Sequence, residues 1–186
     1  MNESELLITR LSPLTLCLVQ IHGGDLAQVG SLISGALDTL GKGSTATAGP
    51  RVYAMGPTEW LLIDYPLDDV RRRLSADLGR VMVRVTNVSA AFSSLRVEGS
   101  AARALLASDI GAPRAATASR PGEYARTRLG QIDLWLHCVG SNSFDLHMDR
   151  TLVDYLEAWL GAQYQAHSQD LQGFAPKSIA ASRSPT

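Results

Sequence analysis

Hydrophobic and polar positions along the first half of the chain follow two periods, one typical of strands and one typical of helices. Short apolar or alternating runs predict four strands, over residues 14–21, 51–55, 59–64 and 81–85. Apolar residues three and four positions apart predict two helices, over residues 25–40 and 67–78, each followed by a glycine. In chain order these elements read β-α-β-β-α-β, which is the split order of ferredoxin-like units.

The second half starts with the same order of elements and continues into a longer run of strands. A strand-like segment at residues 91–97 precedes a short helix at residues 101–106. Residues 109–122 are rich in Ala, Pro and Ser and predict a linker. Three alternating segments then predict a meander, over residues 124–129, 132–139 and 144–148. After Asp149, a last helix is predicted from an apolar stripe of Leu152, Tyr155, Leu156, Trp159 and Leu160.

Together these elements predict a single α+β domain over residues 8–164, formed by two related ferredoxin-like βαββ-type halves. The pseudo-halves cover about residues 14–88 and 89–164. Residues 165–186 are mostly polar, so we expect a flexible or partner-ordered C-terminal tail. A chain of 186 residues fits one such domain, since domains commonly hold roughly 100–200 residues.

The meander offers the strongest candidate for a site, because its pattern divides the strands into an apolar and a polar face. Pairing Gly140 with Phe144 around a three-residue loop gives one wholly apolar face: Ile132, Leu134, Leu136, Cys138, Phe144, Leu146 and Met148. The opposite face carries Asp133, Trp135, His137, Asp145 and His147. This register places His137 directly across from His147. A two-residue loop would mix polar and apolar side chains on both faces, so the three-residue loop is preferred.

Facing imidazoles with carboxylates nearby permit two interpretations of this polar face. Such groups bind metal ions, but the sequence offers no clear third ligand, since His22 and His167 lie in a distant turn and in the tail. A polar face that another chain covers accounts for the same residues and is the interpretation we favour, with no metal site. No Gly-x-Ser-x-Gly elbow is present and neither cysteine lies in an electropositive turn, so no catalytic or cofactor-binding residue is predicted.

Composition and charge restrict the class of partner. The chain has 17 Lys and Arg against 18 Asp and Glu, which argues against nucleic-acid binding because that binding rests on a basic surface. The apolar stretch at residues 14–21 is much shorter than the roughly 20 residues that cross a bilayer, so no membrane association is expected. The N-terminus is acidic where a secretory leader is basic, and Cys17 and Cys138 fit buried thiols. We therefore expect a cytoplasmic protein.

Three blocks of sequence occur in an order that is shared with one known family. They read GPTEWLLI at residues 56–63, VTNVSAAFSSLRVEG at 85–99 followed by AARALL at 101–106, and RTRL at 126–129 with Gln131, His137 and FDLHMDR at 144–150. These blocks resemble the gamma subunit family of heterotetrameric sarcosine oxidase. Shared order over several blocks is stronger evidence than one short motif.

The resemblance implies a fold, partners and a function. Gamma subunits are similar in fold to the folate-binding domain of the glycine-cleavage aminomethyltransferase. They belong to a complex with alpha, beta and delta subunits that oxidatively demethylates sarcosine, or a related N-methyl amine. FAD, FMN, NAD, tetrahydrofolate and zinc are expected in the other subunits, and none is expected to be bound by this chain. The chain itself is expected to be non-catalytic and to stabilise the folate-binding end of the alpha subunit.

If the chain is such a subunit, we expect aromatic and partly polar side chains to contact its partners. The candidates are Trp60, Trp135, His137, Asp145 and His147, together with the C-terminal tail. Two other hypotheses stay open from the sequence. The chain could be a stand-alone tetrahydrofolate-dependent methyl or aminomethyl transferase, or a small-molecule-binding module.

Overall fold

The structure is a computed structural model that describes residues 6–23, 50–77, 81–109 and 120–173. Its strands form two antiparallel sheets, one of four strands and one of five. This mixed α+β architecture confirms the predicted fold class of two ferredoxin-like halves. The helix predicted over residues 25–40 and most of the predicted linker lie outside the described residues.

The four-stranded sheet has the strand order of a ferredoxin-like unit. Its strands are β2 (Leu16–His22), β3 (Arg51–Gly56), β4 (Glu59–Ile63) and β5 (Met82–Asn87), in the order β3-β4-β2-β5. The helix α2 (Leu67–Asp77) packs on one face, where Val70 and Leu74 join a buried cluster with Cys17 and Trp60. The sequence predicted these strands and this helix to within a few residues.

The five-stranded sheet contains the predicted meander and one strand that the sequence pattern did not indicate. Its strands are β1 (Leu7–Arg10), β6 (Phe92–Glu98), β7 (Tyr124–Leu129), β8 (Ile132–Gly140) and β9 (Ser143–Asp149), in the order β1-β6-β9-β8-β7. The described helices that follow β6 are α3 (Ala102–Asp109) and α4 (Val153–Gly173). Two short 3-10 turns, η1 (Ser89–Ala91) and η3 (Arg150–Leu152), precede β6 and α4.

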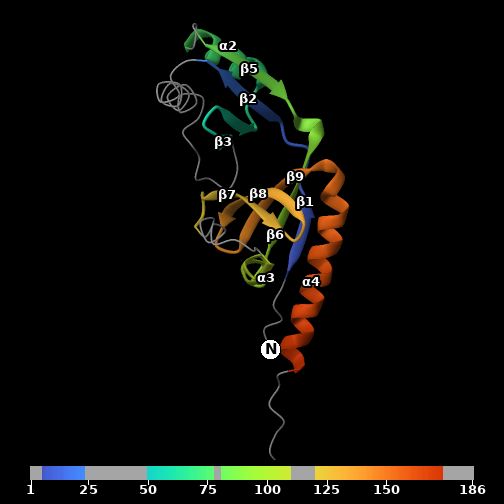
Figure 1. Ribbon diagram of the computed structural model, residues 1–186. Coiled ribbons are helices and arrows are strands. Elements are labelled where there is room, and N and C mark those ends of the chain that lie inside the picture. The colour runs from blue at the N-terminus through green and yellow to red at the C-terminus, as the bar shows by residue number, and fades with distance from the viewer. Residues whose placement is uncertain (1–5, 24–49, 78–80, 110–119, 174–186) are drawn as a thin grey trace, which may run out of the picture.

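The molecule is layered, with the two sheets face to face and helices on the outside (Figure 1). α2 covers the outer face of the four-stranded sheet, and α3 and α4 cover the outer face of the five-stranded sheet. The main core lies between the five-stranded sheet and α3 and α4. All seven residues that the sequence predicted for the apolar face of the meander belong to this core.

Strand β1 comes from the N-terminal end but pairs with β6 of the second half. The guanidinium of Arg10 then reaches Asp154 and Glu157 of α4, with Nε of Arg10 at 2.7 Å from Oε2 of Glu157. A strand of four residues carries too few alternating positions to produce a sequence signal. The two halves of the sequence therefore do not correspond to two fully separate sheets.

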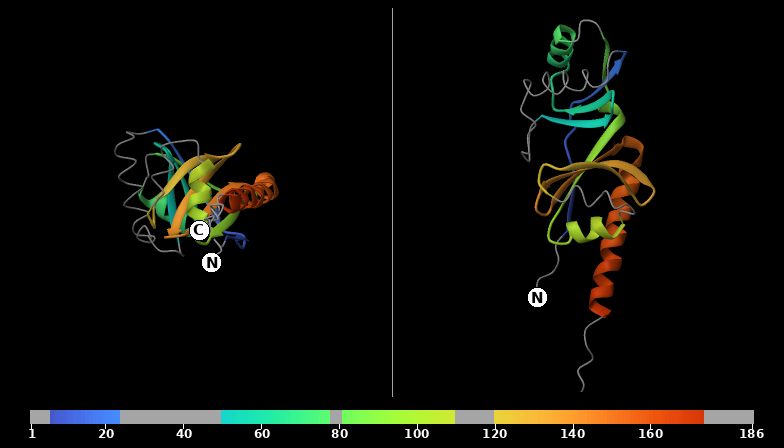
Figure 2. Two further views of the ribbon diagram at one scale, coloured as in Figure 1. Left: turned by 90° about the horizontal axis from the view of Figure 1, so that it is seen from below. Right: turned by 60° about the vertical axis from the view of Figure 1, so that its left-hand side comes forward.

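Helix α4 continues to Gly173 and runs along the five-stranded sheet and past it (Figure 2). Residues 165–173, which the sequence predicted to belong to a flexible or partner-ordered C-terminal tail, are therefore part of a helix. Residues 165–172 include three Gln, one Ala and one Leu, which favour helix even without an apolar stripe. The described part of α4 extends to Gly173. Among the described helices, none is both long and apolar enough to cross a membrane.

The hairpin between β8 and β9 has a different register from the predicted one. His137 lies opposite Asp145, and Trp135 lies opposite His147. The register is displaced by two residues, and an even displacement leaves every side chain on its predicted face. A β-bulge between Cys138 and Gly140 adds one residue to β8. With this extra residue, the hairpin has a short loop and the strands still keep one apolar and one polar face.

Candidate functional site

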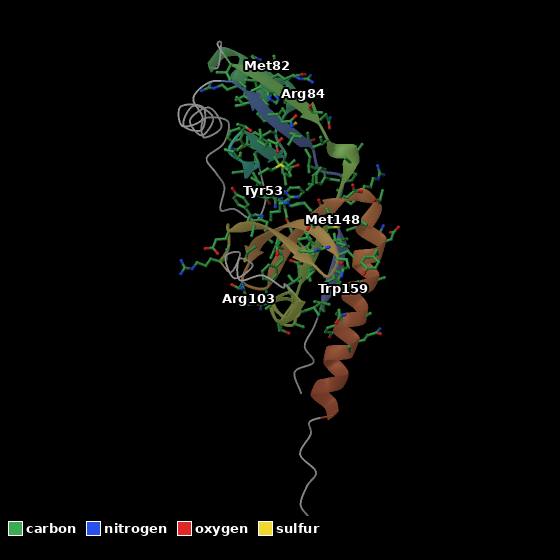
Figure 3. All side chains as sticks on the ribbon, viewed as in Figure 1. Tyr53, Met82, Arg84, Arg103, Met148 and Trp159 are labelled. Atoms are coloured by element: carbon green, nitrogen blue, oxygen red, sulfur yellow. The ribbon has the colours of Figure 1, made fainter. Side chains whose placement is uncertain are left out.

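The space between the two sheets contains a group of buried polar side chains, which we call the inter-sheet cluster. Strand β3 contributes Arg51 and Tyr53 from the four-stranded sheet, and the five-stranded sheet contributes Ser94, Arg96, His137, Asp145 and His147. These residues point inward because each alternates along its strand with residues of the outer cores. Tyr53 projects from β3 toward the five-stranded sheet (Figure 3).

Asp145 is the centre of the cluster and is fully buried. Arg51 donates from Nη1 to Oδ2 of Asp145 at 2.8 Å, and Arg96 donates from Nε to Oδ1 at 2.7 Å and from Nη2 to Oδ2 at 3.1 Å. Burial by itself raises the pKa of Asp145, but the hydrogen bonds from Arg96 and Arg51 outweigh it and hold the pKa below its usual value. The carboxylate is therefore ionised and is satisfied by two cations.

His137 lies next to this ion pair and accepts a hydrogen bond. Nη1 of Arg51 is 2.9 Å from Nδ1 of His137, and since an arginine only donates, Nδ1 carries no proton. The imidazole is then neutral with its proton on Nε2. Burial first, and the charge of Arg51 second, lower the pKa of His137 to about 4.

His147 is fully buried between Ser94 and Tyr53. The hydroxyl of Ser94 is 2.7 Å from Nδ1, and the hydroxyl of Tyr53 is 3.5 Å from Nε2. Burial lowers the pKa of His147 to about 3 and raises the pKa of Tyr53. A hydrogen-bonded Ser–His pair is one part of a nucleophilic catalytic site. His147, however, has a pKa too low for efficient proton transfer near neutral pH, and both Ser94 and His147 are buried.

Aromatic rings close the cluster at the edge of the sheet. Tyr124 of β7 stacks on Tyr53 with ring centroids 4.6 Å apart, and its hydroxyl accepts a hydrogen bond from the backbone N–H of Ala54 at 3.0 Å. On the other side the ring of Trp135 lies 5.6 Å from that of Phe92. The Arg51–Asp145 ion pair and the stacked rings of Tyr53 and Tyr124 thus join the two sheets, whereas the contact between Phe92 and Trp135 lies within the five-stranded sheet.

The structure corrects the expectation that these residues form a surface for a partner. His137, Asp145 and His147 are at most 2% exposed, because β3 of the same chain covers the polar face of the meander. Trp135 is buried in the inter-sheet space as well. Trp60 points the other way and packs under α2, so the structure does not bring it together with the rest.

The sequence did not identify Arg51, Tyr53, Ser94 and Arg96 as members of the cluster. A weak signal exists for β6, where Ser94, Arg96 and Glu98 alternate with Leu95 and Val97. No local signal exists for Arg51, because its partners are more than eighty residues away in the sequence. Within the described residues, no group of three or more His, Cys, Asp or Glu side chains is arranged to hold a metal ion.

Comparisons with known proteins show what fold this chain shares. No family model and no curated protein matches the sequence. The structure is similar to a chain of the heterotetrameric sarcosine oxidase from Corynebacterium sp. U-96, solved in complex with pyrrole 2-carboxylate. The TM-score is 0.65 at 20% sequence identity, and the match covers 89% of this chain and 87% of that chain. The two chains therefore share a fold and are of similar length.

Proposed function

We propose that this chain is a non-catalytic, gamma-type subunit of a sarcosine oxidase-type complex that oxidatively demethylates sarcosine or a related N-methyl amine. Its partners are the alpha, beta and delta subunits, and it stabilises the folate-binding end of the alpha subunit. The other subunits hold FAD, FMN, NAD, tetrahydrofolate and zinc.

The likeness to a chain of the heterotetrameric sarcosine oxidase is the observation on which this proposal rests. The match extends over nearly the full length of both chains, so it includes both sheets and is not limited to one common motif. The three sequence blocks that resemble gamma subunits provide separate support. The first block covers the end of β3 and all of β4, the second covers the end of β5, β6 and the start of α3, and the third lies along β7–β9. The second and third blocks contain five members of the inter-sheet cluster: Ser94, Arg96, His137, Asp145 and His147.

The chemistry of the inter-sheet cluster supports a non-catalytic role for this chain. Asp145 is paired with two arginines, and the imidazoles of His137 and His147 are neutral and buried. Groups held in this way join two sheets rather than exchange protons with a substrate. A rigid two-sheet body is what a subunit with a stabilising role requires.

Co-purification tests the proposal directly. An affinity-tagged form of this chain is produced together with candidate alpha, beta and delta chains from the same genome and is then fractionated by size-exclusion chromatography. We expect the tag to elute with the flavin absorbance in one peak that forms hydrogen peroxide from sarcosine or another N-methyl amine. Elution of the tagged chain alone, free of flavin, would contradict the proposal.

A calorimetric titration of the isolated chain distinguishes the proposed subunit from a stand-alone folate-dependent transferase. A transferase of that kind binds tetrahydrofolate by itself, whereas the proposed subunit leaves folate binding to the alpha chain. We expect no heat of binding beyond dilution. Saturable binding with one site per chain would favour the transferase.

A further inference from the structure

We propose that the cavity at the junction of the two sheets is a binding site for a small organic carboxylate. This junction cavity has a volume of about 310 Å³, at the lower end of the roughly 300–1,000 Å³ that small-ligand sites occupy. It lies between the loop of residues 11–14, the start of β6 and the beginning of α4. It does not include Asp145 or the histidines, and the proposal does not depend on the proposed subunit function.

The backbone explains why a cavity forms at this place. Strand β1 pairs with β6 up to Arg10, and the N–H of Leu11 still donates to the carbonyl of Ser94. Continuing that register would place Pro13 opposite Phe92. Proline has no N–H to donate, so the ladder stops and the chain turns away toward β2. The edge of β6 at Phe92 and Ser93 then borders the cavity instead of a neighbouring strand.

The charged side chains that line the cavity are both arginines, Arg10 and Arg150. Arg10 is already paired with Asp154 and Glu157, which are not part of the lining. Arg150 has neither a hydrogen-bond nor an ion-pair partner among the described residues, and it is exposed at the rim. A guanidinium in this position fits a carboxylate, because its parallel N–H groups match the two oxygens.

The other lining residues favour an organic acid over an inorganic anion. Leu14, Leu16, Phe92 and Val153 provide apolar walls. Ser12 and Ser93 also line the cavity, and each carries a hydroxyl group. A carboxylic acid with one ring or a short alkyl chain combines an apolar body for these walls with a single negative charge for Arg150.

Benzoate is a suitable probe, and benzamide is its matched neutral control. Binding to the full-length chain is followed by changes in backbone amide chemical shifts. We expect benzoate to bind with a dissociation constant below about 10 mM, to shift the amides of residues 11, 12, 14 and 92–94, and to bind more weakly as salt is added. Benzamide and inorganic phosphate are expected to leave these amides unchanged.

Variants at the rim test the role of Arg150. Because Arg150 is exposed, Arg150→Gln is expected to fold normally and to weaken benzoate binding about tenfold, whereas Arg150→Lys retains part of the affinity. The control is Arg84→Gln on β5, an exposed arginine at the far end of the molecule (Figure 3), which is expected to bind like the original chain.

Three results would each overturn the proposal. They are no benzoate-dependent shifts at residues 11, 12, 14 and 92–94, equal binding of benzamide or phosphate, and unchanged benzoate affinity in Arg150→Gln. A folded variant is confirmed by its melting temperature, so loss of binding cannot be mistaken for unfolding.

Discussion

At the scale of single residues, Asp145 forms a buried ion pair with Arg51 of the opposite sheet and another ion pair with Arg96 of its own sheet. A buried charge is tolerated only when its partners are in place, and removing one partner leaves the others uncompensated. Asp145 receives three hydrogen bonds from Arg51 and Arg96, which come from opposite sheets. Loss of its charge would therefore leave two guanidinium groups, one of them only 5% exposed, without a counter-ion.

Replacement of Asp145 by Asn is expected to lower the free energy of unfolding by about 3–5 kcal/mol. Urea titration followed by circular dichroism measures this change. Asp133→Asn is the matched control, because Asp133 of β8 lies on the same face of the meander as Asp145 but is exposed. The control is expected to change stability by less than about 0.5 kcal/mol. Equal losses in the two variants would mean that the Asp145 ion pairs contribute little.

The two buried histidines are expected to make the free energy of unfolding increase with pH. An unfolded histidine titrates near pH 6.5, whereas the pKa of His137 is about 4 and that of His147 is about 3 in the folded chain. Between these values the unfolded chain binds more protons, so stability rises with pH. The stabilisation is fully present above pH 6.5 and is lost as the pH falls toward 4 and below.

We expect the free energy of unfolding to decrease as the pH is lowered from 7 to about 4.5, by up to roughly 1.4 kcal/mol per pH unit for each histidine. Urea titrations across this range measure the slope. His147→Gln removes one of the two groups and is expected to reduce the slope by about half. An unchanged slope in this variant would show that His147 is not protected from protonation by its burial.

At the scale of elements, the sequence was sufficient for most strands and for the faces of the meander. The apolar set of β8 and β9 was predicted correctly because face assignment depends only on alternation. The register was wrong by two residues, because the bulge beside Cys138 is a local adjustment that alternation does not report. Strand β1 and the last turns of α4 were missed because neither carries a clear apolar period.

Two glycines in the second half test how turn and helix geometry contribute to stability. Gly130, in the turn between β7 and β8, has a φ of +59°, and a Cβ there would come within 3.3 Å of the ring of Trp159. Gly161 lies within α4, where a Cβ would meet nothing within 4 Å. The same substitution is therefore expected to have opposite effects at the two positions.

Gly130→Ala is expected to lower the melting temperature and to cost about 1–2 kcal/mol, from the left-handed backbone alone. Gly161→Ala is expected to raise stability by about 0.5–1 kcal/mol, because alanine favours helix over glycine. Thermal unfolding of both variants measures whether each substitution raises or lowers the stability of the fold. A stabilised Gly130→Ala variant would show that the turn is not held in the conformation described.

At the scale of the whole molecule, no local pattern in the sequence indicates that the polar face of the meander is covered by another part of the same chain. When only β7, β8 and β9 are considered, that polar face resembles an exposed surface that another chain could cover. Arg51 and Tyr53 cover it from another sheet, and such long-range pairing leaves no local trace in the chain. His137, Asp145 and His147 are therefore buried by this chain itself and do not form an exposed surface.

Reconstitution of the amine-oxidising complex with and without this chain tests the central claim most directly. The turnover number per flavin is measured with sarcosine, together with the half-life of activity on warming. For a non-catalytic stabilising subunit, we expect an unchanged turnover number per flavin and a much shorter half-life when the chain is omitted. A turnover number that falls to zero without the chain, and returns when it is added, would contradict the non-catalytic role; an unchanged half-life would contradict the stabilising one.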